Sequence, residues 1–283
     1  MNILELEDSL KQIAEQQNKA SLAYFDGFSP EDMYHILYYP FSERCPIQLN
    51  FELSGDSLTK SPLMMIVLDF LDVLENDGVK LTPKGNLPRK VIEELYNKKY
   101  LPDQYIDKGI TKLRTEENWI ALHSVKLVLT LAGITKKYKG KLQITKKYFS
   151  ALKEKQHSII FKALFQTFTT QFNWAYNDRF EHEQTGQLGF LFMLYLINKY
   201  GVEYQDLKYY TEKYFKAFPM LVCSGQFFQN MRYNESEHCV HTRFFDRFAQ
   251  WFGFADILLG PEKYFDRTIQ IRRTDLLTSL FMK

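Results

Sequence analysis

The sequence lacks the motifs that mark several common classes of enzyme. It contains no G-x-x-x-x-G-K-[ST] phosphate loop, no G-x-G-x-x-G after a long strand and no G-x-S-x-G nucleophile motif. It also lacks an H-E-x-x-H helix and a C-x-x-C pair. These absences argue against nucleotide-binding and serine-hydrolase chemistry, so we predict no catalytic residue and no cofactor.

Cysteines and long apolar runs are also scarce. The three cysteines, Cys45, Cys223 and Cys239, are an odd number, which fits a reducing compartment better than a disulfide framework. The longest apolar stretches, such as LGFLFMLYLINKYG at 188–201, are shorter than the roughly 20 residues that span a bilayer. The N-terminus is acidic and amphipathic, unlike a targeting segment. We therefore expect a cytoplasmic protein without a membrane span.

Apolar residues, in contrast, are plentiful enough for a large core. They make up 45% of the chain, and aromatic residues make up 16%. This composition is typical of a globular protein and not of a disordered one. A length of 283 residues exceeds that of a typical single domain, so we expect two coupled lobes.

Charge is distributed very unevenly along the chain. Residues 1–78 hold 4 Lys/Arg against 14 Asp/Glu, whereas residues 79–160 hold 18 against 7. The remaining residues, 161–283, hold 14 against 13, and the whole chain has a net charge of +2. A basic segment of this length attracts polyanions, but it can equally lie against the acidic segment of the same molecule.

One order of elements recurs along the chain: a helix with apolar periodicity, a glycine, a strand or hairpin, a threonine and another helix. It occurs around Gly78, Gly133 and Gly253, which precede the threonine by 4, 12 and 21 residues. These unequal intervals exclude a repeat of fixed period. They are better explained by β-hairpin wings of different lengths. The segment around 190–217 shows the helix, the glycine and a later helix, but no hairpin.

This order resembles the winged-helix variety of helix-turn-helix domain, over about half of the chain. The resemblance implies a mainly α-helical fold with short β-hairpins, built from tandem degenerate winged-helix-like units in two lobes. We expect an N-terminal helical lobe at 1–110 and a C-terminal lobe at 111–283. The C-terminal lobe would contain two winged-helix-like units, at about 115–155 and 239–281.

A second resemblance is local and covers residues 27–95. In GFSPEDMYHILYYPF, Ser29 can cap a helix that begins at Pro30 and runs to about Tyr38. Together with VKLTPKGNLPRKVIEEL at 79–95, this stretch resembles an uncharacterised bacterial family with an LTxxGNLP segment. Some members carry this segment beside a cysteine-rich SEC-C tail. That tail is absent here, so the resemblance implies no metal-binding function.

The sharpest candidate site is a basic hairpin. The sequence ITKKYKGKLQITKKYF, at 134–149, predicts two strands around a turn at Lys139 and Gly140, followed by a helix capped by Thr145. Its lysines can contact the phosphates of DNA or RNA. The candidate nucleic-acid-binding residues are Lys136, Lys137, Lys139, Lys141, Lys146 and Lys147. A solvated wing, or one docked on the acidic segment, is the structural alternative.

The candidate recognition helix is the one that follows this hairpin, at 146–155. It offers Ser150 and the neighbouring Gln156 but no arginine for reading base edges, so strong sequence specificity is not expected. We therefore predict a non-enzymatic protein that contacts nucleic acid, or a regulatory partner, through the basic wing. A protein-interaction scaffold without nucleic-acid binding is the first alternative.

A metal-dependent enzyme is the second alternative. Two segments, NDRFEHEQ and SEHCVH, carry imidazole, thiolate and carboxylate groups that together can bind zinc. The groups concerned are Asp178, Glu181, His182, His238, Cys239 and His241. No known ligand spacing relates the two segments, so we assign no metal ligand.

Overall fold

The fold is mainly helical with short β-hairpins, which confirms the predicted fold class. The computed structural model describes residues 3–222, 235–261 and 268–282. Within these ranges the strands form two small antiparallel sheets of three strands each. None of the helices in the described ranges has the length and apolar character needed to cross a membrane.

The N-terminal region consists of helices that precede the first sheet. Its elements are α1 (Ile3–Lys19), η1 (Ala23–Phe25), α2 (Pro30–Tyr38) and α3 (Gly55–Leu58). Helix α2 has the predicted limits and the predicted cap, because Ser29 Oγ accepts the backbone N–H of Asp32 at 3.1 Å. Asp32 in turn accepts the backbone N–H of Ser29 at 2.9 Å, which completes a capping box.

A first unit of residues 62–153 follows. Its elements are α4 (Pro62–Leu74), β1 (Val79–Lys80), α5 (Arg89–Tyr96), the short α6 (Gln104–Asp107) and η2 (Glu116–Asn118), α7 (Ile120–Leu131), β2 (Thr135–Tyr138), β3 (Lys141–Ile144) and α8 (Lys146–Lys153). The helical segment after Thr115 is divided, because Trp119 is extended between η2 and α7. The buried Trp119 donates its indole N–H to the Leu101 carbonyl at 2.9 Å.

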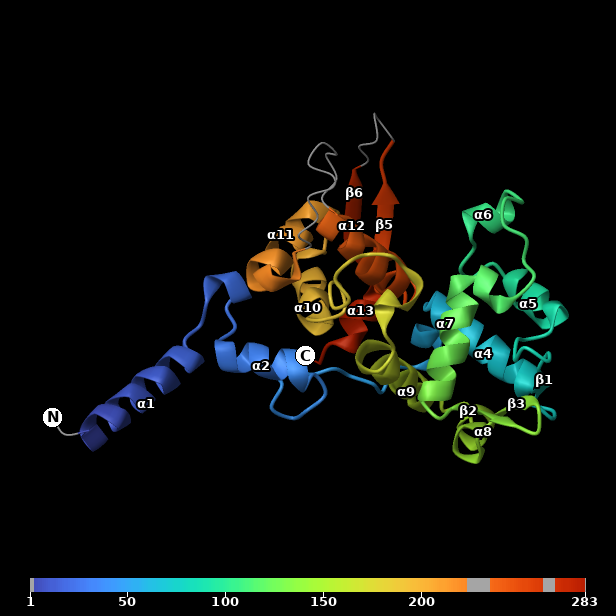
Figure 1. Cartoon of the computed structure of the whole chain (residues 1–283), viewed down its shortest axis with the longest axis horizontal. Helices are drawn as coiled ribbons and strands as arrows, with labels where there is room; N and C mark the ends of the chain where they lie inside the picture. Colours follow the sequence, from blue (N-terminus) through green and yellow to red (C-terminus); the bar gives the residue numbers. More distant parts are fainter. Residues whose placement is uncertain (1–2, 223–234, 262–267, 283) are drawn as a thin grey trace.

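A second unit, residues 190–280, repeats this order. Its elements are α10 (Phe190–Tyr200), β4 (Gln205–Asp206), α11 (Leu207–Ala217), η4 (Pro219–Leu221), α12 (Glu235–Val240) continued by the π-helix η6 (His241–Ala249), β5 (Ala255–Leu259), β6 (Ile269–Arg273) and α13 (Asp275–Leu280). Helix α9 (His157–Thr170) and η3 (Trp174–Asn177) connect the two units. Figure 1 shows α9 between the two groups of elements.

The two sheets have the same topology. The strand orders are β1-β3-β2 and β4-β6-β5, so in each unit the last strand lies in the middle. Each hairpin therefore pairs with a short strand from much earlier in its own unit. Val79 lies opposite Leu142, and Gln205 lies opposite Ile271. The segment around 190–217, in which the sequence showed no hairpin, thus contributes β4, the first strand of the second sheet.

The glycine that follows the first helix of each unit lies against the middle strand. A Cβ on Gly78 would lie 2.3 Å from the Leu142 carbonyl oxygen, and Gly78 has a φ of +71°. A Cβ on Gly201 would lie 3.0 Å from the backbone nitrogen of Arg273. Glycine is therefore required at position 78 for two reasons. It ends the helix with a positive φ, and it lets the backbone approach the middle strand closely.

The predicted lobes share one of these sheets. Strand β1 belongs to the expected lobe 1–110, whereas β2 and β3 belong to 111–283. The segments 115–155 and 239–281 each form the second half of a unit whose first half lies earlier in the chain. The division of the chain into two lobes near residue 110 stays a prediction.

The β2–β3 and β5–β6 hairpins are closed at the base by the same kind of contact. Thr145 Oγ1 donates to the Gly133 carbonyl at 2.9 Å, and Thr274 Oγ1 donates to the Gly253 carbonyl at 2.6 Å. Thr145 occupies the predicted N-cap position of α8, but its hydroxyl donates to Gly133 and makes no capping hydrogen bond to α8. Thr274 does cap α13 as expected, since its Oγ1 also accepts the N–H of Leu277.

The core is centred on aromatic side chains of α9. The Phe165 ring centroid lies between 5.6 and 6.1 Å from the rings of Phe41, Phe51, Phe190, Phe248, Phe252 and Phe254. These partners come from the N-terminal region and from the second unit. Helix α7 of the first unit also packs on α9. The aromatic side chains of α9 therefore join the parts of the chain in one hydrophobic core.

Asp26 ties the segment after α1 to the second unit. It accepts hydrogen bonds from Lys199 Nζ at 2.8 Å, Lys213 Nζ at 3.0 Å and the Tyr200 hydroxyl at 2.8 Å. Burial alone would raise the pKa of Asp26, but hydrogen bonds from these three groups outweigh it and hold the pKa below its usual value.

We expect Asp26→Asn to lower the free energy of unfolding by about 1–3 kcal/mol at pH 7, since it removes charged hydrogen bonds. The folded-state pKa of Asp26 is depressed, so its contribution is present above about pH 4 and is lost as the pH falls through the folded value. Urea unfolding of both proteins between pH 3 and 7 should show the difference narrowing in acid. Asp56→Asn, at an exposed position, is the matched control; an equal effect in this variant would contradict the prediction.

Candidate nucleic-acid interface

The basic wing has the geometry that the sequence predicted. Strands β2 and β3 pair from Thr135 opposite Ile144 to Tyr138 opposite Lys141. The turn has positive φ values at both central residues, +46° at Lys139 and +74° at Gly140. Two such residues in a row are typical of the tight turn whose twist suits a two-residue hairpin. The hairpin prediction is confirmed.

The two faces of the first sheet differ in polarity. Val79 and Leu142 lie opposite each other on the buried face. On the other face Lys80, Lys141 and Tyr138 form one cross-strand row, because Lys141 pairs with both neighbours. Lys80 is a basic residue of this face that the sequence analysis missed, since it belongs to a strand distant in sequence.

Tyr138 stands among lysines on this face. Its side chain is 52% exposed. Lys136 Nζ lies 5.7 Å from the ring centroid and Lys139 Nζ lies 5.3 Å from it. Both distances are within the range of cation–π contacts. The exposed ring of Tyr138 therefore lies beside two positively charged groups.

The six candidate lysines differ in their partners. Lys141 forms an ion pair with Asp77, at the end of the acidic segment. The other five lysines are exposed and form no ion pair with any carboxylate in the described ranges. They are Lys136, Lys137 and Lys139 on the wing and Lys146 and Lys147 at the start of α8.

The acidic segment therefore covers the basic one only in part. Lys153, near the end of α8, pairs with Glu75 just beyond α4, in addition to the Lys141–Asp77 pair. These two contacts fix the base of the wing and α8 against α4. The tip of the wing stays exposed to solvent.

The turn LTPKGNLP is held by a buried ion pair. Lys126 of α7 pairs with Glu116, and both side chains are nearly inaccessible, at 10% and 1% exposure. Lys126 Nζ also donates to the Gly85 carbonyl at 2.8 Å, and Glu116 Oε2 accepts the Leu87 N–H at 3.0 Å. The turn is therefore docked on α7 as part of the structure, and this pair was not foreseen from the sequence.

Helix α7 itself is almost fully buried. Ala121, Leu122, Val125, Val128 and Leu129 are at most 2% exposed, and Lys126 is buried as well. Helix α8 is the recognition helix predicted from the sequence. It keeps one exposed face, with Phe149 and Ser150 beside its lysines. Helix α8 and the hairpin therefore present exposed side chains to a large ligand, whereas α7 exposes side chains at its C-terminal end, at Thr130 and Leu131.

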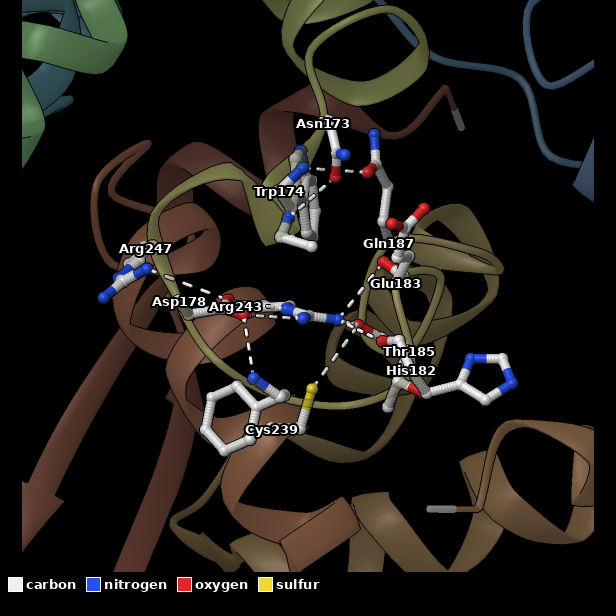
Figure 2. Close-up of polar contacts among 12 residues, drawn as sticks. Asn173, Trp174, Asp178, His182, Glu183, Thr185, Gln187, Cys239, Arg243 and Arg247 are labelled. Carbon is white, nitrogen blue, oxygen red and sulfur yellow. Dashed lines mark hydrogen bonds and ion pairs between the residues drawn. The ribbon is translucent and has the colours of Figure 1, made fainter. Parts of the chain in front are cut away.

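Three of the candidate metal-binding residues, Asp178, His182 and Cys239, lie around Arg243 (Figure 2). Arg243 of η6 is buried and binds both oxygens of Asp178 at 2.7 Å. Its third nitrogen donates to the carbonyls of His182 at 2.6 Å and Thr185 at 3.0 Å. Cys239 Sγ lies 3.8 Å from the same Thr185 carbonyl. The cluster fixes the loop 178–185 to η6.

The histidines do not complete a ligand set either. The rings of His238 and His241 are 6.4 Å apart, and His241 Nε2 lies 3.2 Å from Asp246 Oδ1. Burial lowers the pKa of His241 to about 4. In the described ranges no group of three or more His, Cys, Asp or Glu side chains is placed to hold a metal ion. Cys223 lies outside those ranges.

Comparison with known protein families gives a match on the unit that carries the β2–β3 hairpin. Residues 59–157 match the family model of the Y4jL N-terminal domain. The Y4jL-matching segment, residues 59–157, contains all of α4 to α8, including the LTPKGNLP turn and the six candidate lysines. No curated protein and no solved structure matched the chain. The resemblance to the family with SEC-C tails stays a prediction.

The contributions of Lys126 and Glu116 to the free energy of unfolding should depend strongly on each other. Lys126→Met leaves Glu116 charged and buried, and we expect a loss of about 3–5 kcal/mol in the free energy of unfolding. The double variant Lys126→Met/Glu116→Gln removes both charges and keeps an acceptor for Leu87, so it should lose less than the sum of the single variants. Urea unfolding of the four proteins measures the coupling; strict additivity would refute it.

Proposed function

We propose that the protein binds the phosphate backbone of nucleic acids through the wing β2–β3 and the start of α8. One observation carries the proposal: five lysines of this surface are exposed and form no ion pair with a described carboxylate. Surface charges without an internal partner are available to replace the counterions of a polyanion. The exposed Lys80 of the neighbouring strand β1 extends the positive charge across the sheet, whereas Lys141 is paired with Asp77.

We further propose that each unit is a winged-helix module. The order of helices and strands, with the last strand in the middle of the sheet, supports this reading in both units. In a helix-turn-helix module the second helix of the pair enters the major groove. The corresponding helices are α7 in the first unit and η6 in the second.

Both of these helices are packed inside the protein. Lys126 on α7 and Arg243 on η6, two side chains that could otherwise read bases, are buried and bound to carboxylates, and the partly exposed Arg247 of η6 lies 3.9 Å from Asp178. Reading of base edges by either helix is therefore not part of the proposal. Binding should depend on charge and should discriminate little between sequences.

Tyr138 favours nucleic acid with unpaired bases. An exposed ring flanked by ammonium groups can stack on one base while the lysines contact the adjoining phosphates. Bases in a duplex are already stacked on one another and are not available to the ring. We therefore propose a preference for single-stranded DNA or RNA.

Charge reversal on the wing should weaken binding. We expect Lys136→Glu/Lys139→Glu to bind a fluorescent oligonucleotide much more weakly, and the slope of log affinity against log salt to fall by about two. Fluorescence anisotropy at several salt concentrations measures both effects. Lys208→Glu/Lys216→Glu, two exposed lysines of α11, changes the net charge equally and is the control. Equal losses in both variants, or no binding by the unmodified protein at low salt, would reject the proposal.

Removal of the ring should act selectively on single strands. Tyr138→Ala should cost about 1–3 kcal/mol in binding a single-stranded oligonucleotide and much less in binding the corresponding duplex. Tyr138→Phe keeps the stacking surface and should bind like the unmodified protein. Tyr105→Ala is the control, because Tyr105 is 54% exposed and belongs to α6. A uniform loss on single strand and duplex would leave the lysines as the binding site and exclude the stacking role.

A further inference from the structure

The LTPKGNLP turn, residues 81–88, lies against the tip of the basic wing. Leu81 donates its backbone N–H to the Gly140 carbonyl of the hairpin turn at 2.9 Å. A Cβ on Gly85 would lie 3.4 Å from Lys137 Nζ, so the ammonium group of this wing lysine is beside the turn. Two segments that are distant in sequence therefore form one continuous surface.

Hydrogen bonds fix the backbone of the turn. The Thr82 carbonyl accepts the N–H of Gly85 at 2.8 Å, and Thr82 Oγ1 accepts the N–H of Asn86 at 3.0 Å. Pro83 and Lys84 are therefore the central residues of a β-turn, and both are exposed. The buried ion pair of α7 holds the turn from within. Because this backbone is already ordered, binding of an anion at Lys84 costs less conformational entropy.

Two lysines of this segment have no acidic partner. Lys84 of the turn and Lys90 at the start of α5 are exposed and form no ion pair with a carboxylate in the part of the chain that the structure describes. Arg89, in contrast, is paired with Glu93 at 2.7 Å. Lys84, Lys90 and Lys137 thus concentrate positive charge, and a polyanion bound here would relieve their mutual repulsion.

The turn and Tyr138 lie on opposite faces of the hairpin. Lys137 and Tyr138 are consecutive residues of β2, so their side chains point to opposite faces. Lys137 is directed to the turn, whereas Tyr138 belongs to the row with Lys141 and Lys80. A ligand that contacts both surfaces must bend around the tip of the hairpin. A single strand can follow this path, whereas a duplex is stiff over lengths far greater than the hairpin.

We propose that one single strand of DNA or RNA binds the wing and then bends around its tip to the LTPKGNLP turn, where Lys84 and Lys90 contact its phosphates. This second contact rests on the proposed function, because the same strand must also bind the wing. The β2–β3 hairpin, β1 and α5 lie on one side of the molecule in Figure 1. The extended site accepts a longer strand than the wing alone, within the roughly 4–16 nucleotides that compact single-strand-binding domains cover.

Removal of two charges tests the second contact. Lys84→Gln/Lys90→Gln should bind a fluorescent oligothymidylate of about 12 nucleotides roughly tenfold more weakly, and the slope of log affinity against log salt should fall by about 1.4, since two phosphate contacts are lost. The variant should bind an oligothymidylate of about 4 nucleotides like the unmodified protein, because the shorter strand does not reach the turn from Tyr138. Fluorescence anisotropy at several salt concentrations measures both affinities.

Lys108→Gln/Lys112→Gln is the matched control. These exposed lysines follow α6 in the same unit, and α6 lies far from the hairpin in Figure 1. The control changes the net charge equally and should bind both oligonucleotides like the unmodified protein. Unchanged urea midpoints show that both variants keep the fold. Equal losses in the two variants, or unchanged binding of the longer strand by the Lys84/Lys90 variant, would overturn the second contact.

A duplex and the stoichiometry test the bent path. The Lys84/Lys90 variant should bind a duplex of about 12 base pairs like the unmodified protein, because the duplex cannot follow the path around the tip. The longer single strand should saturate the protein at one strand per chain. An equal loss on the duplex, or two strands per chain, would overturn the path. Absence of all binding by the unmodified protein at low salt would reject the proposed function together with the second contact.

Discussion

The burial of α9 is the constraint on which the accessible surface of this protein depends. Helix α9 lies between the two units and packs on α7 of the first unit and on η6 of the second. Phe168 stacks on Phe248 of η6 with centroids 5.9 Å apart, and α7 of the first unit packs on the same helix. Ile120 of α7, Phe168 of α9 and Arg247 of η6 line one small cavity where the three helices meet. Helices α7 and η6 are therefore part of the core, whereas the tip of the β2–β3 hairpin faces solvent.

Buried and exposed charges have different roles in this arrangement. The Lys126–Glu116 and Arg243–Asp178 pairs are removed from water, and backbone groups satisfy their remaining hydrogen-bonding capacity. Their loss would leave a charge without solvation, so they fix the loops that they bind. The lysines of the wing are solvated at little cost and can exchange partners. The protein thus uses some of its cations to hold its own backbone and leaves others exposed to solvent.

Local features of the fold could be predicted from the sequence, whereas contacts between distant segments could not. The cap at Ser29 and the turn at Lys139 and Gly140 depend on neighbouring residues, so their patterns are visible in the chain. The pairing of Val79 with Leu142 joins residues more than 60 positions apart, and no local pattern specifies it. The candidate lysines were found because they are clustered in sequence. Arg243 was missed as the centre of its cluster, since a basic residue in an amphipathic helix ordinarily indicates a solvated face.

In both hairpins a threonine hydroxyl donates to a glycine carbonyl at the base. The length of the hairpin can therefore change without changing how its base is held. The Gly133–Thr145 and Gly253–Thr274 contacts hold the two ends of each hairpin together, whatever number of residues lies between them. The entropy of closing a loop rises only slowly with its length, so added residues at the tip cost little stability. The two units can therefore diverge in reach while their helices keep the same packing. The Lys139–Gly140 turn is for the same reason a suitable place to insert a peptide tag without disturbing the core.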